Sequence, residues 1–240
     1  MRNHIINFYD IKFHNYDFKK IFKKIDKGGY LVAPAASSLS KILKNKTYHK
    51  SLKNSDIAIL DSGFFCILLR IFKKKKVKKL SGYLFLKSFL NLKFKKNVKF
   101  FNIDPNKEES KLNYNYLVKK KKIFNVISYC APSYNKRIYD IKLINIIKKE
   151  KPKYVIINIG GEVQEILAEY IRNKINYKIS ILCTGAAIAF LTKKQAPLMN
   201  DKIDKFYLGW FVRFLHNPGK YYSRIVSSLN LIRLFLIIKK

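Results

Sequence analysis

The stretch that decides the fold is residues 154–165, Tyr-Val-Ile-Ile-Asn-Ile-Gly-Gly-Glu-Val-Gln-Glu. A short apolar run, rich in β-branched residues, ends at a pair of glycines, and a helical pattern begins directly after them. Runs of this length and composition are typical of strands that are buried on both faces of a parallel sheet. The stretch therefore predicts a strand, a turn and a helix in direct succession.

Three further apolar runs also end at an acid or near a glycine: residues 57–60 before Asp61, residues 98–103 before Asp104, and residues 179–183 before Gly185. Helical patterns follow these runs, and this alternation predicts a doubly wound α/β sheet with helices on both faces. Open parallel sheets bind ligands beyond the carboxyl ends of their strands. We therefore expect Asp61, Asp104 and the two glycine turns at one crevice.

The composition bounds the class of protein. The chain has 240 residues, of which 48% are hydrophobic, enough for a sizeable core, and nothing in it indicates a disordered or collagenous protein. We expect a Rossmann-like, mostly parallel α/β core over residues 1–197. A helical appendage is expected over residues 198–240, where the sheet rhythm stops.

The net charge of +35 is extreme. The Lys residues are spread through the chain among abundant Ile and Asn, which is also what a compositional bias of the source genome would produce. Such a positive field would draw the protein to anionic lipid headgroups, to nucleic acid or to a phosphorylated substrate. The charge alone does not choose among these partners.

The cysteines and the hydrophobic runs bear on the compartment. Cys66, Cys130 and Cys183 are widely spaced within apolar runs, so they suggest neither a disulfide framework nor a zinc site, and buried thiols in a reducing compartment are expected. The first residues lack the apolar core of a signal peptide, and no run of about 18 apolar residues is present to span a bilayer. These features predict a cytoplasmic protein.

Two local motifs could carry chemistry. Gly160 and Gly161 follow a strand and precede a helix, so backbone N–H groups there could approach an anion such as a diphosphate; the alternative is a plain helix cap. The dinucleotide fingerprint and the phosphate loop with its Gly-Lys-Ser/Thr ending are both absent. Asp61, at a strand end beside Ser62 and Gly63, could serve as a general base, or it could cap the next helix.

The order of these motifs resembles that of the bacterial WecB/TagA/CpsF glycosyltransferases, which form glycosyltransferase family 26. The resemblance covers roughly residues 28–224 and rests on six pieces in the expected order: residues 61–63, Gly82, residues 160–165, Gly185 with Ala186, Ala196 with Pro197, and residues 210–213. No single piece is decisive, but six in order with compatible spacing make chance matching a poor explanation.

The resemblance implies transfer of an N-acetylmannosamine-like sugar from a UDP-sugar donor to a polyprenyl diphosphate-linked acceptor, with inversion and without a required metal or other cofactor. It implies that Asp61 is the catalytic base. The predicted substrate-binding residues are Ser62, Gly63, Gly82, Asp104, Gly160, Gly161, Gln164, Glu165, Gly185, Ala186 and Arg213. Arg213 would hold phosphate, unless it is a structural cation of its helix.

Several positions depart from the family pattern. Residues 33–35 are Ala-Pro-Ala in place of Thr-x-Asn, residues 82–84 are Gly-Tyr-Leu in place of Gly-Thr-Asp, residues 188–189 are Ile-Ala in place of Phe-Asp, and Gln195 replaces an Arg. Polar contacts to the donor are lost at these positions. The chain is therefore interpreted as a member of a divergent subgroup, with another donor or acceptor or with reduced activity.

Residues 221–240 are expected to hold the protein on the inner face of the cell membrane. Ile225, Leu229, Ile232 and Leu236 form one helical stripe, which arginines and an asparagine interrupt, and the stretch is short for a span. The alternative is that this helix packs on the core or on another subunit. Trp210 is expected to pack in the core, because Phe206 and Phe214 lie at helical spacing from it.

These patterns predict an enzyme of surface polysaccharide synthesis whose partners are a UDP-sugar, a lipid-linked saccharide and an anionic membrane surface. No nucleic-acid partner is expected, although a basic nucleic-acid-binding protein is the main rival, because Tyr and Phe interleave with Lys. An inactive member of the same fold is the other alternative. Assembly into a homo-oligomer stays open.

Overall fold

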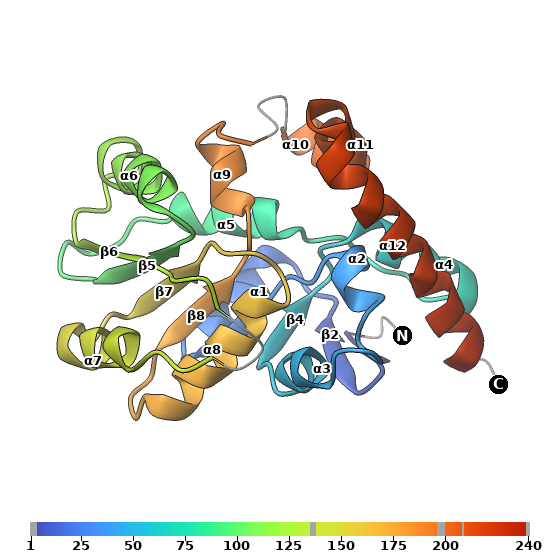
Figure 1. Cartoon of the computed structure of the whole chain (residues 1–240), viewed down its shortest axis with the longest axis horizontal. Helices are drawn as coiled ribbons and strands as arrows, with labels where there is room; N and C mark the ends of the chain where they lie inside the picture. Colours follow the sequence, from blue (N-terminus) through green and yellow to red (C-terminus); the bar gives the residue numbers. More distant parts are fainter. Residues whose placement is uncertain (1–3, 135–137, 196–199, 208, 239–240) are drawn as a thin grey trace.

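The protein is built on one mostly parallel sheet. The structure, a computed structural model, describes residues 4–134, 138–195, 200–207 and 209–238. These residues form an eight-stranded sheet in the order β1-β2-β4-β3-β8-β7-β5-β6 (Figure 1). The strands are β1 (Ile5–Phe8), β2 (Ile11–His14), β3 (Gly29–Val32), β4 (Ile57–Ile59), β5 (Phe100–Asp104), β6 (Val126–Cys130), β7 (Tyr154–Ile157) and β8 (Ser180–Cys183). Only the β1–β2 pair is antiparallel, which confirms the predicted sheet.

Helices connect the strands and continue beyond the last one. Those of the core are α1 (Phe18–Ile25), α2 (Ala36–Leu39), α3 (Lys46–Lys53), α4 (Gly63–Lys73), α5 (Gly82–Leu90), α6 (Lys107–Asn115) with a π-helical turn η1 (Tyr116–Lys120), α7 (Ile141–Glu150), α8 (Val163–Lys174) and α9 (Ala187–Leu191). The C-terminal helices are α10 (Asp201–Lys205), α11 (Gly209–His216) and α12 (Pro218–Ile238).

The two faces of the sheet carry separate apolar clusters. On one face, side chains of α2, α3, α4, α7, α8 and α12 pack against the strands. On the other face, α1, α5, η1 and α9 do so. Along β3, for example, Tyr30 and Val32 belong to the first cluster and Leu31 and Ala33 to the second. Burial on both faces explains why the central strands β3, β8 and β7 are mostly apolar in the sequence.

The chain leaves neighbouring strands toward opposite faces. After β3 it continues into α2 and α3, which cover one face, and after β8 it enters α9, which covers the other. Because β3 and β8 are adjacent and parallel, their carboxyl ends lie at a topological switch point of the sheet. This is the place where open α/β sheets bind their ligands.

The N-terminal hairpin was not predicted from the sequence. Tyr9 and Asp10 connect β1 to β2 with φ angles of 49° and 62°, as a two-residue hairpin turn requires. Phe8 and Phe13 are buried on the core side of the hairpin. Their burial fixes the pairing of the two short strands.

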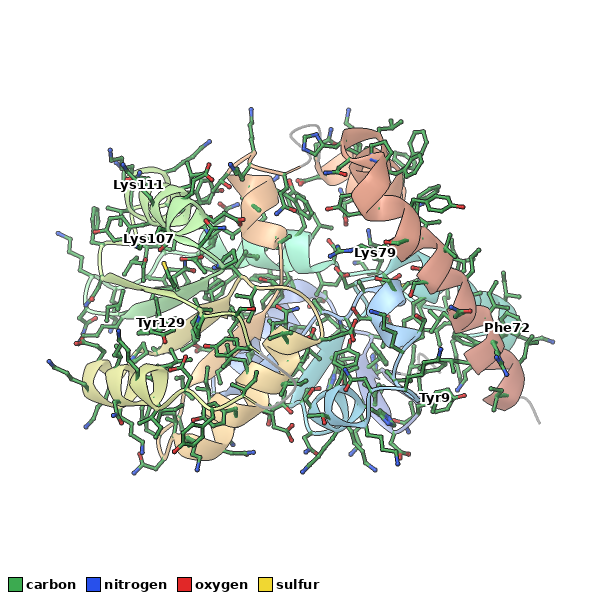
Figure 2. The ribbon with its side chains drawn as sticks, viewed as in Figure 1. Tyr9, Phe72, Lys79, Lys107, Lys111 and Tyr129 are labelled. Carbon is green, nitrogen blue, oxygen red and sulfur yellow. The ribbon has the colours of Figure 1, made fainter. Side chains whose placement is uncertain are left out.

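The C-terminal segment forms three helices where the sequence predicted one helical pattern leading to Pro218 and an aliphatic tail. Helix α12 runs across the side of the molecule that carries α2 and α4 (Figure 1). Leu231, Leu234 and Phe235 are buried there, and the Phe235 ring lies 4.7 Å from that of Phe8. Figure 2 shows Tyr9 and Phe72 at the lower end of this helix, where the Tyr9 hydroxyl donates to the Leu234 carbonyl. Helix α12 therefore completes the core.

Two local predictions were wrong. Trp210 was expected in the core but is 49% exposed, because the apolar side of α11 has only partial cover from the described residues. Cys130 was expected to be buried, but it is exposed, because β6 is the edge strand of the sheet. Cys66 and Cys183, which lie within the core, are buried as predicted.

Candidate active site

Asp61 lies just beyond the carboxyl end of β4, as predicted. Its Oδ1 accepts a 2.7 Å hydrogen bond from the main-chain N–H of Gly82, the first residue of α5. The preceding turn is bonded to the same strand end, because the N–H of Leu80 donates to the Leu60 carbonyl. The sheet and α5 together therefore hold this half-buried carboxylate.

Gly82 brings three strand ends together. A Cβ atom at this position would lie 3.2 Å from the Ala33 Cβ, 3.3 Å from the Thr184 carbonyl oxygen and 3.6 Å from Asp61 Oδ1. Ala33, Asp61 and Thr184 follow the adjacent strands β3, β4 and β8. The absence of a side chain at Gly82 therefore lets the start of α5 approach these strand ends closely.

Ser62 and Gly63 have structural roles beside Asp61. The Ser62 hydroxyl caps α4 by accepting a 3.2 Å hydrogen bond from the N–H of Phe65. A Cβ atom on Gly63 would lie 2.5 Å from the Tyr207 ring, so only glycine leaves room for that tyrosine. The alternative interpretation of the motif, in which Asp61 caps α4, is therefore wrong, because Ser62 is the cap.

The glycine pair after β7 forms an exposed turn with a strained neighbour. Gly160 and Gly161 are exposed, whereas the positive φ of 74° falls on Glu162, a non-glycine residue. The Glu162 carboxylate pairs with Lys41 at 2.7 Å and accepts a longer hydrogen bond from Asn45. These contacts with the segment after α2 hold the unfavourable conformation in place.

Gln164 links the start of α8 to the turn after β8. Its Oε1 accepts from the N–H of Gly185 at 2.9 Å, and its Nε2 donates to Glu165 Oε1 at 3.0 Å. Gly185 has a φ of 57°, which glycine adopts without strain. The two glycine turns predicted from the sequence are thus joined through one amide side chain.

Glu165 lies beneath this turn and is only 1% exposed. Its Oε2 has no hydrogen-bond partner among the described residues. Burial raises the pKa of the Glu165 carboxyl to about 7. The nearby charge of Glu165 adds to the effect of burial in raising the pKa of the enclosed Tyr48 hydroxyl. In this structure Glu165 contacts Gln164, which lies between it and the turn after β8.

Asp104 ends β5 within a network of buried amides. Its Oδ1 accepts from Asn113 at 2.7 Å and from Asn158 at 2.9 Å, and its Oδ2 accepts from Asn102 at 2.6 Å. Burial raises the pKa of this carboxyl, and the amide donors oppose the rise. The network joins the ends of β5 and β7 through Asn158, two residues before Gly160.

The remaining predicted positions lie further along the chain. Ala186 precedes α9 and is half-buried. Arg213 belongs to α11, but its side chain lies outside the described part of the structure. Ala196 and Pro197, which carried part of the resemblance, also lie outside the described residues.

Sequence reasoning missed the residues that attach the C-terminal segment beside Asp61. Lys79 and Ser81 both bond to the carboxylate of Asp204 in α10. Lys79 does not stand out in so basic a chain, and its partner Asp204 is more than a hundred residues away in the sequence. The buried Thr184 hydroxyl, which has no partner among the described residues, was also missed.

The described residues form neither a metal cluster nor a membrane span. No group of three or more His, Cys, Asp or Glu side chains is arranged there to hold a metal ion. Within the same part of the chain, no helix has the length and hydrophobicity of a membrane span. A shallow pocket lined by Val98, Lys99, Glu150 and Lys153 lies at the opposite, amino edge of β5 and β7.

Comparisons with known proteins give the family of the chain. The model of the glycosyl transferase WecG/TagA/CpsF family matches residues 6–240, which is essentially the whole chain. No curated protein matched. The match includes both the sheet with Asp61 and the C-terminal helices.

Proposed function

Because the chain belongs to the WecG/TagA/CpsF family of glycosyl transferases, we propose that it transfers an N-acetylmannosamine-like sugar from a UDP-sugar to a polyprenyl diphosphate-linked acceptor. The family assignment places the chain among transferases of polysaccharide synthesis. The donor, the acceptor and the linkage are parts of the proposal.

Asp61 is the catalytic base of the proposed reaction. It takes the proton of the acceptor hydroxyl as that oxygen bonds to the anomeric carbon of the donor. The bond from this carbon to the diphosphate breaks, UDP leaves with the bonding electrons, and the configuration inverts. The hydrogen bond from Gly82 N–H to Asp61 Oδ1 is the observation that carries the assignment, since it fixes the carboxylate at the strand ends.

The donor site of the proposal is the pair of turns after β7 and β8. Gly160 and Gly161 offer exposed backbone at the start of α8, where N–H groups favour a diphosphate. Gln164 and Gly185 border the same place through their shared hydrogen bond. Asp104 and Glu165 support these turns from below, and Arg213 of α11 assists at the phosphates.

The basic surroundings would offset the charge of the departing diphosphate, so the proposed reaction needs no divalent ion. Addition of EDTA to the full chain should leave the rate of transfer unchanged. A loss of activity that Mg²⁺ or Mn²⁺ restores would overturn this part of the proposal.

The proposal also places the enzyme on the inner face of the cell membrane through its C-terminal helices. The face of α12 turned away from the core exposes apolar side chains, and α11 adds others; these are Tyr222, Val226, Leu229, Leu236 and Ile237 with Trp210, Phe211 and Leu215. An apolar helix face on so basic a protein favours an anionic lipid surface.

The test of the proposed function is a transfer assay with the full chain. A panel of UDP-sugars is first ranked by the rise in melting temperature that each produces. The best donors are then incubated with a water-soluble analogue of the lipid-linked acceptor, and release of UDP and formation of a glycoside of inverted configuration are measured. UDP binding without transfer from any donor would instead favour an inactive member of the fold.

A further inference from the structure

The C-terminal segment is attached to the core by a buried ion pair. Lys79 Nζ lies 2.8 Å from Asp204 Oδ1 and also donates to the main-chain carbonyl of Asp204. Ser81 donates to the other carboxylate oxygen at 2.9 Å. The two charged side chains are only 9% and 3% exposed. Helix α10 is therefore fixed to the segment between α4 and α5 by three hydrogen bonds.

The same short segment holds Asp61. Lys79 and Ser81 are separated only by Leu80, whose N–H donates to the Leu60 carbonyl. Ser81 caps α5, and the next residue, Gly82, donates its N–H to the Asp61 carboxylate. An unbroken run of four residues therefore connects the Asp204 contacts to the Asp61 contact.

A second contact of the C-terminal segment is made at Gly63, two residues after Asp61. The Tyr207 ring fills the space left by Gly63, and Arg70 of α4 donates to the Tyr207 hydroxyl at 2.7 Å. Lys79 Nζ also lies 5.5 Å from the centre of this ring. In Figure 2, Lys79 is labelled beside the upper half of α12, whereas Phe72 and Tyr9 are labelled at its lower end.

Stability alone does not account for such a pair. Removing two charges from water costs free energy that their attraction often fails to recover, so apolar replacements of buried pairs are frequently neutral or stabilising. A buried pair does fix one geometry, because each charge accepts only a partner in the correct position. The geometry fixed here is that of the 79–82 segment beside Asp61.

We propose that Lys79 and Asp204 are a positioning pair, which sets the Asp61 carboxylate for proton removal only when α10 is docked on the core. The inference rests on the proposed function, because it assigns Asp61 the role of base. Neither Lys79 nor Asp204 touches the substrate in this account. Both act through Ser81 and Gly82.

The test replaces the pair by apolar residues of similar size. In Lys79→Met/Asp204→Leu, we expect kcat to fall about tenfold to a hundredfold, while KM for the UDP-sugar changes less than about twofold, because a small displacement of a base is costly. The acid limb of the kcat/KM profile should also move. Full turnover with an unchanged profile would overturn the proposal.

A second ion pair of α10 supplies the matched control. Lys87 of α5 pairs with Asp201 at 2.7 Å, but it lies outside the 79–82 segment. Lys87→Met/Asp201→Leu should therefore keep kcat within about twofold of wild type. An equal loss of kcat in both double variants would overturn the proposal, since any loosening of α10 would then suffice.

Hydrogen exchange separates this inference from the proposed function. Backbone amides of residues 80–84 should exchange at least about tenfold faster in Lys79→Met/Asp204→Leu than in the control, whether or not a donor is known. Should the apolar variant not fold, Asp204→Asn, which keeps the shape but removes the charge, is measured instead. Unchanged exchange would overturn the inference. Faster exchange in Lys79→Met/Asp204→Leu, together with no sugar transfer by the wild-type protein, would overturn only the proposed function.

Discussion

The main-chain N–H of Gly82 donates a 2.7 Å hydrogen bond to the carboxylate of Asp61. The two residues are joined across a whole helix, α4, and both lie where the parallel strands β3, β4 and β8 end. This bond ties one oxygen of the carboxylate to the backbone of α5. The site therefore depends on the close approach of α5 to the sheet.

Gly82→Ala tests that approach. The added methyl group would press on Ala33 and on the Thr184 carbonyl, so we expect a loss of about 1 kcal/mol in the free energy of unfolding. Sugar transfer should fall as well, because α5 and its N–H would move away from Asp61. Urea unfolding and initial rates measure the two effects.

Gly219→Ala is the matched control for this change. Gly219 also lies in the first turn of a helix, α12, but outside its own turn no atom of the described residues lies within 4 Å of its added methyl group. Alanine there should be neutral or slightly stabilising. Equal stability of both variants would show that α5 does not approach the strand ends as closely as described.

The buried carboxyl of Glu165 predicts a pH dependence of stability. Its pKa of about 7 in the folded protein lies above its ordinary value, so the folded state holds the proton more tightly than the unfolded chain does. Stability should therefore decrease as the pH rises from about 4.5 to about 7, by up to about 3 kcal/mol, and then level off.

Glu165→Gln removes this titration while keeping an acceptor for Gln164. The variant should lose the decrease between pH 5 and pH 7 and should be more stable than wild type at pH 8. Urea unfolding of both proteins at pH 5, 6, 7 and 8 measures the difference. Parallel curves for the two proteins would mean that Glu165 is not enclosed as described.

Asp104→Ala tests the network that joins β5 to β7. Three amide groups would each lose a hydrogen bond to a carboxylate inside the protein, so we expect a loss of about 3 kcal/mol or more in the free energy of unfolding. Lys107→Ala, at an exposed position of the neighbouring helix α6, should change it by less than about 0.5 kcal/mol. Similar values for the two variants would contradict the network.

The exposed face of α12 predicts how the protein binds membranes. Val226→Ser/Leu229→Ser/Leu236→Ser should weaken sedimentation with anionic liposomes by about tenfold or more, because each apolar side chain contributes on the order of 1 kcal/mol at a lipid surface. Substitution leaves the buried Leu231 and Phe235 in place, whereas removal of the whole helix would uncover the core.

The control for membrane binding is Ile71→Ser/Phe124→Ser. Both side chains are also apolar and exposed, but they lie outside the C-terminal helices. This variant should bind liposomes like wild type, and binding of both should weaken as salt is added. An equal loss of liposome binding in the two variants would show that binding depends on exposed apolar side chains in general and not on those of α12.

The sequence was most informative where strands are buried on both faces. Strands β4, β7 and β8 are largely apolar runs, and β5 is apolar apart from Asn102 and Asp104; their order with helices between them predicted the parallel sheet. The β1–β2 hairpin was not predicted, because its strands interrupt the buried apolar residues with exposed ones and so form no continuous apolar run. Because β1 and β2 are as long as β7 and β8, the interrupted apolar pattern, rather than strand length, limited that prediction.

The C-terminal helix and the site were predictable only in part. Both faces of α12 carry apolar residues, so the stripe through Leu229 and Leu236 did not identify Leu231 and Phe235 as the buried set. At the site, Asp61 and the glycine turns follow directly from strand ends. The Lys79–Asp204 pair depends on how two distant segments dock, and no local pattern encodes that.

The most direct test of the account is the rate of sugar transfer by Asp61→Asn. The asparagine carbonyl can still accept from the Gly82 N–H, so the variant should fold and bind UDP like wild type. It cannot remove a proton, and we therefore expect transfer to fall by about 10²- to 10⁴-fold. Turnover within a few-fold of wild type would contradict the assignment of Asp61 as the catalytic base.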